Sequence, residues 1–401
     1  MIDILTQSQT LATWVRDIRR ELHRYPEVGT ALPRTRALVL KELQPLGLTV
    51  RPDVGGGIVA DLETDRPGPR IALRADMDAL TMREETGLDF ASQIPDQAHM
   101  CGHDAHTAML LGAARLAAMH RQSLPGPVRF LFQPNEENQP GSALPMVESG
   151  CLDSVNKIFG LHVWPGHPVG WVGTRPDALM ARPDVFSITL TGQGGHASAP
   201  HLCLDPVPAA CRLVCDLQTI VSRRVPPLEP AVVSVTTVRA GTAYNIIPDS
   251  VFLQGTVRSL SDRVGALIQD EMTRLVKGLT AATGIRAEVR YEQGYPVVVN
   301  DQHLADEVIR TAQRLGADAD DNVAPVMAGE DFSHYLSRVP GCFFFLGCGN
   351  HSDQAGLHNA CFTLDEACLP WGVAMLTALA LNDHPPDHPN FPAATEHGLR
   401  D

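Results

Sequence analysis

Residues 101–120, CGHDAHTAMLLGAARLAAMH, join a loop of metal-binding residue types to a long run of alanine, leucine and methionine. The composition from Asp104 onwards is typical of a helix that is buried on all sides. Apolar strands are expected before and after it, in PRIALRADMDAL and in GPVRFLFQPNEE. Strands that alternate with buried helices predict an α/β fold with a mixed, mostly parallel sheet that is covered on both faces.

The middle of the chain follows a different pattern. Between residues 182 and 293 we expect four strands and two amphipathic helices, DPVPAACRLVCDLQTIVSRRV and SDRVGALIQDEMTRLVKGLTAATG, in the order βαββαβ of a ferredoxin-like unit. Helix–strand alternation resumes afterwards, so this unit is predicted to be an insertion. We therefore expect a discontinuous first domain (1–181 and 294–383), an inserted second domain (182–293) and a disordered tail (384–401) rich in proline and histidine.

The composition narrows the classes of function. The chain has 401 residues and a net charge of −14 at pH 7 with no block of basic residues, so neither nucleic acid nor an anionic membrane is an expected partner. No apolar run is long enough to cross a bilayer, and the N-terminus does not resemble a signal peptide. The nine cysteines are scattered and form no CxxC pair, which favours a reduced, cytoplasmic protein.

Residues that can bind metal recur at places far apart in the sequence. Cys101 and His103 precede the buried helix, and a thiolate and an imidazole are both good ligands for a divalent transition metal. Glu136 and Glu137 follow an apolar strand, at the end where α/β sheets bind ligands. Taken singly, each pair also fits a structural role, as a buried thiol with a helix-start histidine or as a solvated turn.

Two more histidines occur in apolar or small-residue surroundings. His162 lies inside the strand FGLHVWP, and His358 is flanked by small residues in GLHNACF. A lone histidine in a strand is more often a hydrogen-bonded core residue, and one in a loop is often a plain surface residue. Asp76 and Asp78 follow a strand and are expected to orient histidines.

Together these places supply five metal ligands, namely Cys101, His103, Glu137, His162 and His358. Five mixed ligands exceed what one tetrahedral zinc needs and suit two metals that share a bridging group. Glu136 is left over. Because a metal lowers the pKa of a water molecule and a free carboxylate can accept its proton, the pattern predicts a metal-dependent hydrolase.

These motifs resemble those of a known family. CGHDAHTAML, QPNEE, GLHVWP, GGHASAPH and GLHN are similar to motifs of the metallo-amidohydrolases that include hippurate hydrolase, N-acyl-amino-acid amidohydrolases and auxin-conjugate hydrolases, within the aminoacylase and carboxypeptidase G group. The resemblance runs from LHRYPEVG to GLHNACF, about nine-tenths of the chain. It implies a zinc-peptidase-like catalytic domain and a ferredoxin-like lid that also forms a homodimer or higher homo-oligomer.

The resemblance also implies roles for individual residues. The five ligands would bind two divalent ions per subunit, either zinc, which the thiolate favours, or manganese, and Glu136 would be the general acid/base. His196, in TGQGGHASAPH, would stabilise the oxyanion in its own or a partner subunit's site, and Asn245 and Arg258 would hold a substrate carboxylate. The structural alternatives are a polar residue in a glycine-rich turn for His196 and an exposed strand residue for Arg258.

Three further features accompany the matching motifs. Glu330 and Asp331 of MAGEDFSHYL are expected to brace a loop near the site, and His23 of LHRYPE is expected to be structural. The chain departs from the family after the glutamate pair, where NQPGSALPM replaces a glycine-rich run and Pro140 stiffens the loop.

The predicted activity is hydrolysis of the amide bond of N-acyl amino acids, hippurate-like or with another acyl group, to release the amino acid and a carboxylic acid. The nearest alternative is a dipeptidase or carboxypeptidase of the same family. A cysteine hydrolase using Cys101 with His103 would be sensitive to thiol alkylation and indifferent to chelators. A non-catalytic metal-binding homologue is the third alternative, and the spare Glu136 argues against it.

Overall fold

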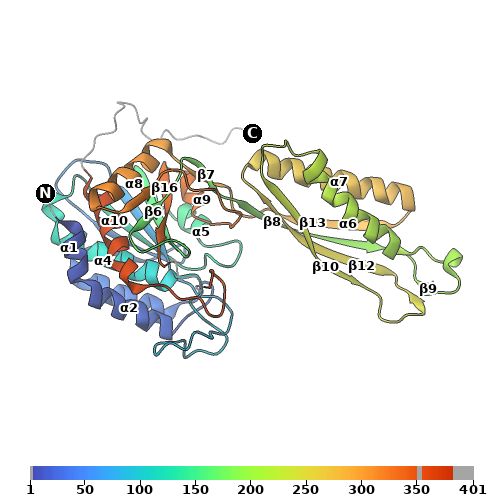
Figure 1. Ribbon diagram of the computed structural model, residues 1–401, viewed down its shortest axis with the longest axis horizontal. Coiled ribbons are helices and arrows are strands. Elements are labelled where there is room, and N and C mark those ends of the chain that lie inside the picture. The colour runs from blue at the N-terminus through green and yellow to red at the C-terminus, as the bar shows by residue number, and fades with distance from the viewer. Residues whose placement is uncertain (1–2, 350–354, 383–401) are drawn as a thin grey trace.

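The computed structural model describes residues 3–349 and 355–382, and Figure 1 shows them as a large body and a smaller, elongated body. The large body contains both the first and the last described segments, and the small body is formed by the middle of the chain. The predicted disordered tail, 384–401, lies outside the described residues. Within the described part, no helix combines the length and the apolar character needed to cross a membrane.

The large body is built on an eight-stranded sheet. Its strands are β1 (Thr49–Val54), β2 (Gly57–Leu62), β3 (Ile71–Asp76), β4 (Val128–Gln133), β5 (Lys157–Trp164), β6 (Trp171–Gly173), β15 (Asp318–Asp320) and β16 (Gly341–Gly347). Their order in space is β1-β2-β4-β3-β5-β16-β6-β15. The central strands β4, β3, β5 and β16 are parallel, so the residues that follow them meet at one edge of the sheet.

Helices cover both faces of this sheet. They are α1 (Ile4–Thr10), α2 (Ala12–Arg24), α3 (Pro33–Leu43), α4 (His103–Met119), α5 (Ala143–Glu148), α8 (Gln302–Leu315), α9 (Ser333–Leu336) and α10 (Leu369–Leu381). Neighbouring residues of β4 belong to different cores: Phe130 packs in the core that includes α2, α4, α8 and α10, and Leu131 in the one that includes α5 and α9. α4 is buried along nearly its whole length, as its composition predicts.

The small body has the predicted βαββαβ order. Its elements are β8 (Arg182–Thr191), α6 (Pro206–Arg223), β10 (Ala231–Ala240), β12 (Ser250–Ser259), α7 (Asp262–Thr283) and β13 (Arg286–Glu292). The strands form an antiparallel sheet in the order β10-β12-β8-β13, and both helices pack on one face of it (Figure 1). Phe186, Ile188 and Leu190 of β8 belong to the core between sheet and helices.

Two pairs of short strands complete the structure: β7 (Asp177–Met180) with β14 (Val298–Asn300), and β9 (Gly195–His196) with β11 (Ile246–Ile247). The predicted fold class, a mixed α/β sheet domain with a separate small antiparallel domain, is confirmed. The division of the chain at residues 182 and 293 stays a prediction, although the six elements of the small body run from Arg182 to Glu292.

Candidate metal centre

A tight turn before α4 brings two of the predicted ligands together. Cys101 and His103 are separated by Gly102, which has a φ of 93°. A Cβ at Gly102 would lie 2.4 Å from Val163 Cγ2, so the turn requires glycine both for its left-handed backbone and for space. The buried side chains of Cys101 and His103 consequently face the same region, at the end of β5.

The two ring nitrogens of His162, in β5, have different roles. Nδ1 lies 2.7 Å from the carbonyl oxygen of Val163, which can only accept a hydrogen bond, so Nδ1 is the donor. Nε2 therefore carries the lone pair, and it lies 3.3 Å from Cys101 Sγ. Ligand atoms of Cys101, His103 and His162 all lie within 4.8 Å of one another.

Asp78 holds the loop after β4 against this group. Its Oδ1 accepts from the N–H of Glu136 at 3.0 Å, and its Oδ2 accepts from the N–H of Glu137 at 3.1 Å. Its carbonyl oxygen lies 3.0 Å from His103 Nδ1, which therefore donates and leaves the lone pair on Nε2. One aspartate thus orients a histidine and both glutamates, a wider role than the orientation of histidines that we expect from sequence.

His358 closes the group from a late loop. It has a φ of 59°, and its N–H donates to the carbonyl oxygen of Met100 at 2.9 Å. Its Nε2 lies 3.3 Å from Cys101 Sγ and 3.3 Å from Glu137 Oε2. The side chain of His358 is 54% exposed, whereas the other members are buried or nearly so, so this is the side of the cluster that opens to solvent.

The centre of the cluster contains two buried atoms with no hydrogen-bond partner among the described residues, His103 Nε2 and Glu137 Oε1, which lie 3.7 Å apart. In the neutral ring that a metal would bind, His103 Nε2 offers a lone pair towards Glu137 Oε1, and two buried lone pairs that face each other are unfavourable unless a cation lies between them. Thiolate, imidazole and carboxylate are the ligand types that zinc prefers. The residues present therefore fit a divalent metal centre, and the five predicted ligands lie together there.

Buried carboxylates dominate the charge around this cluster. Burial by itself lowers the pKa of His103, but Asp76 and Asp78 overcome it and raise the pKa to about 10. Burial and then the neighbouring Glu330 raise the pKa of Glu136 well above its usual value. The surroundings thus favour an added positive charge, and the Glu136 carboxyl is suited to hold a proton and pass it on.

Arg74 is a central residue that the sequence analysis did not identify. Its buried guanidinium donates to Asp76 at 2.7 Å, to Glu330 at 3.0 Å and to Asp331 at 2.9 Å. Asp331 also accepts from the N–H of Ser142 at 3.2 Å, so it does brace the loop that follows the glutamates. The available signal was an arginine in the otherwise apolar strand PRIALRAD, which only paired carboxylates can keep buried.

His106 is a second residue without a predicted role. Its Nδ1 lies 2.7 Å from Asp76 Oδ1, and its Nε2 accepts from the N–H of Val163 at 3.0 Å, so both ring nitrogens are engaged. Asp76 therefore orients His106 most closely, because its distance to His103 Nε2 is 3.8 Å. His23 is buried, and its Nδ1 lies 2.8 Å from Asp104, next to the cluster rather than in it.

His196 and Asn245 lie together but far from the cluster of the same chain. The exposed His196 is in β9, which pairs with β11, and the N–H of Ala197 donates to the carbonyl oxygen of Asn245 at 3.1 Å. Figure 1 shows β9 at the end of the small body that is farthest from the large body. One chain therefore does not bring these two residues to its own metal-ligand cluster.

Arg258 lies at the opposite end of the small sheet from Asn245. It pairs with Pro183 at the start of β8, beside the large body, whereas Ser250 at the other end of β12 pairs with Thr191. The 10 residues of β12 span roughly 30 Å, at about 3.3 Å per residue. Arg258 and Asn245 of one chain are consequently too far apart to hold the same carboxylate.

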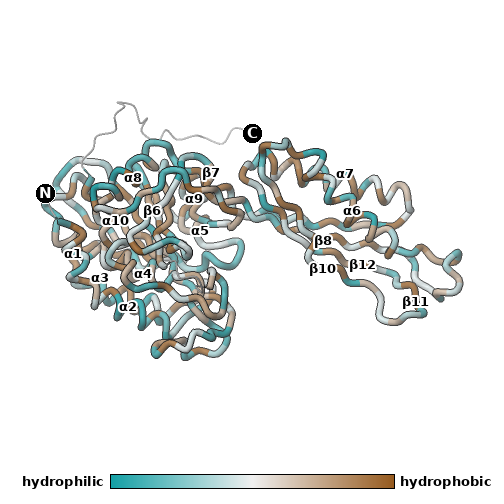
Figure 2. Tube along the Cα trace, in the orientation of Figure 1, coloured by the Kyte–Doolittle hydropathy of each residue, from teal (hydrophilic) through white to brown (hydrophobic). Residues whose placement is uncertain are grey.

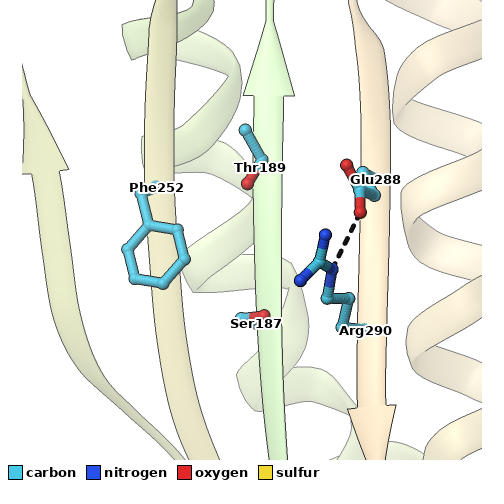
Figure 3. A pocket seen from close by; sticks show the side chains of 5 residues that line it. All are labelled: Ser187, Thr189, Phe252, Glu288 and Arg290. Atoms are coloured by element: carbon cyan, nitrogen blue, oxygen red, sulfur yellow. Dashed lines mark hydrogen bonds and ion pairs between the residues drawn. The ribbon is translucent and has the colours of Figure 1, made fainter.

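The outer face of the small sheet carries a shallow pocket of about 200 Å³. Figure 3 shows the side chains that line it, which are Ser187, Thr189, Phe252, Glu288 and Arg290. Arg290 donates to Glu288 at 2.8 Å, so its charge is already paired. These five residues include none of the predicted site residues.

Comparison with known proteins places both bodies in one family. The profile of peptidase family M20/M25/M40 matches residues 72–382. Thermostable carboxypeptidase 1 of Saccharolobus solfataricus is 38% identical over 374 residues, which cover 92% of this chain and 95% of that protein. N-acetyl-L-cysteine deacetylase of Bacillus subtilis is 40% identical over 361 residues, which cover 90% of this chain and 86% of that protein.

A solved structure gives the same result. The crystal structure of a Bacillus subtilis protein described as a dinuclear metal-binding peptidase is similar with a TM-score of 0.82 and 34% identity, covering 93% of this chain and 98% of that one. The family predicted from the motifs is confirmed by the profile, the relatives and the fold together. The chain therefore belongs to peptidase family M20/M25/M40 and is a metallohydrolase of that family.

Proposed function

We propose that this chain is a binuclear, metal-dependent amidohydrolase that cleaves the amide bond of N-acyl amino acids, hippurate-like or with another acyl group, and releases the amino acid and a carboxylic acid. The observation that carries the proposal is the cluster of five ligand residues, with the unpartnered His103 Nε2 and Glu137 Oε1 at its centre. Glu136 lies beside them, since it, His103 and Glu137 offer atoms within 4.8 Å of one another.

The two ions would be held by Cys101, His103, Glu137, His162 and His358. Zinc is favoured because one ligand is a thiolate, and manganese is the alternative. Bound there, the ions would act as Lewis acids that polarise the amide carbonyl and lower the pKa of the attacking water.

We assign the proton transfers of the reaction to Glu136. Its carboxylate would accept the proton of the attacking water and deliver it to the nitrogen of the leaving amine. Its backbone N–H is fixed by Asp78 at 3.0 Å, so the carboxyl is oriented before substrate binds. The half-exposed His358 marks the side from which substrate enters.

Substrate recognition, as we propose it, involves two copies of the chain. Arg258 would bind the substrate carboxylate from the end of the small sheet that adjoins the large body of its own chain. His196 and Asn245 would reach the cluster of a partner subunit, where His196 would stabilise the oxyanion. The exposed apolar side chains around them support such a contact: Leu202 is 69%, Tyr244 99% and Ile246 56% exposed, and Figure 2 shows the hydrophobic segment at β11.

One side of the small body fits a homodimer better than the other. β10 and β13 are the two edge strands of the described sheet. β13 exposes alternating charges, Arg286, Glu288, Arg290 and Glu292, which protect an edge from pairing, whereas the 10 residues of β10 include a single charge, Arg239. We therefore place the two-fold contact at β10 and the adjoining α6. A wild-type protein that sediments as a monomer at micromolar concentration would contradict the dimer.

Carboxypeptidase activity is the second candidate, because the carboxypeptidase from Saccharolobus is nearly as similar to this chain as the deacetylase from Bacillus. Both kinds of substrate carry a free carboxylate, so Arg258 does not distinguish them. The test is elemental analysis of the purified protein together with a panel of N-acetyl and N-benzoyl amino acids, free dipeptides and N-blocked peptides. We expect two zinc ions per chain and fastest release of amino acid from the acyl amino acids. Faster cleavage of peptides would favour the second candidate, and a metal-free active enzyme would contradict both.

A further inference from the structure

The segment 136–139, which begins with Glu136, is hydrogen-bonded to the junction between the two bodies. The chain passes between the bodies twice, at residues 181–184 and 292–297. In the second passage, Tyr295 Oη donates to the carbonyl oxygen of Glu136 at 2.9 Å. In the first, the carbonyl oxygen of Pro183 accepts from Gln139 Nε2 at 2.8 Å. Each passage therefore makes one hydrogen bond to the four residues that begin with the proposed general acid/base.

These bonds act on the backbone that sets the direction of the Glu136 side chain. Asp78 accepts from the N–H groups of Glu136 and Glu137 at 3.0 and 3.1 Å. The peptide plane between the two glutamates is thus held at its N–H by the large body and at its carbonyl by Tyr295. Because the planar peptides on either side of a Cα determine where its Cβ points, displacement of Tyr295 would turn the Glu136 carboxyl relative to the metal-ligand cluster.

The junction is in turn fixed to the small body by the buried Asp184. Its Oδ1 accepts from Arg182 Nε and from the N–H of Gly294, both at 2.8 Å, and its Oδ2 accepts from Tyr291 Oη at 2.7 Å. Asp184 and Arg182 belong to β8, and Tyr291 belongs to β13. Both passages are therefore hydrogen-bonded to each other and to the small sheet.

The contacts at the junction leave little free space. A Cβ at Gly294 would lie 2.1 Å from the carbonyl oxygen of Pro183 and 2.9 Å from Gln139 Nε2. A Cβ at Gly141 would lie 3.2 Å from Tyr295 Cε1. Close packing of this kind transmits a displacement instead of absorbing it.

We propose that Tyr295 and Gln139 are positioning residues that couple the orientation of the small body to the orientation of the Glu136 carboxyl. The inference rests on the proposed role of Glu136 in catalysis. Arg258 lies at the end of the small sheet nearest this junction, so a substrate carboxylate bound there also orients the small body. Substrate binding at Arg258 and the orientation of the Glu136 carboxyl are thereby linked through the hydrogen bonds of Tyr295 and Gln139.

The first test removes one of these bonds. Tyr295→Phe deletes only the hydroxyl group. We expect kcat to fall about tenfold, with KM within about twofold of the wild type and the metal content unchanged, because the bond orients the base without touching substrate. Amide hydrogen exchange of the metal-loaded protein should become faster at residues 134–142 and stay unchanged in β3 and β5.

The second test disturbs the junction without touching Glu136 or its hydrogen bonds directly. Gly294→Ala places a methyl group against the carbonyl oxygen of Pro183, and we expect the same local increase in exchange at 134–142 and a decrease in kcat of about tenfold. Gly278→Ala, in α7, is the matched control, because a Cβ there meets no atom within 4 Å. It should leave both readouts unchanged.

The outcomes separate this inference from the proposed function. Unchanged exchange at 134–142 in both variants would overturn the coupling, whatever the activity. Faster exchange throughout the large body would overturn it as well, because it would show general destabilisation. If the wild type hydrolyses no member of the substrate panel, the proposed function fails, while the exchange data still decide whether the junction holds this segment in place.

Discussion

The metal-ligand cluster and the far end of the small body differ in one respect. A single chain supplies all residues of the cluster, whereas the residues at the far end of the small body do not reach the cluster of their own chain. The five proposed ligands come from the loop before α4 and its first residue, the loop after β4, β5 itself and a late loop, and all of them lie in the large body. His196 and Asn245 lie at the exposed end of the small body, and none of the candidate metal-binding groups found among the described residues includes them.

The difference follows from strand direction. Parallel strands β4, β3, β5 and β16 deliver the residues that follow them to one edge of the sheet, so distant motifs meet. The long antiparallel strand β12 does the opposite, because it keeps Asn245 and Arg258 near its two ends, roughly 30 Å apart. A single chain thus brings all five proposed metal ligands together, whereas our proposal requires two chains to bind and activate substrate.

Removal of metal should have the largest effect on activity, because it acts on the metal-ligand cluster, which lies within one chain. We expect a chelator to abolish hydrolysis and added zinc to restore it. Since a cation bound to the folded cluster stabilises the folded state, Tm should fall by about 5–10 °C on chelation. Activity assays and thermal unfolding with and without chelator measure both effects. Hydrolysis that survives chelation but is lost on thiol alkylation would instead support a cysteine hydrolase.

Glu136→Gln comes next, since it preserves shape and removes the base. We expect kcat to fall by about 10³-fold or more, because neutral glutamine cannot accept the proton of the attacking water. Elemental analysis should show an unchanged metal content, as Glu136 is not among the proposed ligands. Near-normal turnover would remove the role assigned to this residue.

His196→Ala tests whether the exposed end of the small body acts on another chain. We expect kcat to fall about 10²-fold through loss of oxyanion stabilisation. When this variant is mixed with an equal amount of Glu136→Gln and subunits exchange, half of the dimers pair an intact Glu136 with an intact His196 of the partner. About a quarter of wild-type activity should then return. No recovery despite demonstrated exchange would contradict a role for His196 in the partner subunit's site.

The sequence indicated the residues that meet in this cluster, whose role as ligands stays a prediction, better than it indicated the residues that orient them. Cys101, His103 and Glu137 stand beside recognisable strand and helix boundaries, so their convergence followed from the expected parallel sheet. Arg74 was missed because a charged residue in an apolar strand gives no indication of its partners. Its three carboxylates lie 2 residues away and more than 250 residues away in the sequence.

The roles of the small-body residues were harder to predict for a different reason. Motif resemblance groups His196, Asn245 and Arg258 as substrate contacts but does not say which chain supplies each one. That depends on strand length and on the distance between the two ends of β12, which only the fold provides. The bond from Tyr295 to the Glu136 carbonyl is likewise invisible in sequence, because it joins residues 159 positions apart through a backbone atom.

Arg258→Ala should have the smallest effect of the four, and it tests the other end of the same sheet. We expect KM for acyl amino acids to rise about tenfold with little change in kcat, because the guanidinium holds a carboxylate that takes no part in the reaction. The matching substrate is the amide or ester of the same amino acid, which lacks that charge. On it, the variant and the wild type should behave alike, whereas an equal loss on both substrates would mean that Arg258 supports the structure of the small body instead of binding substrate.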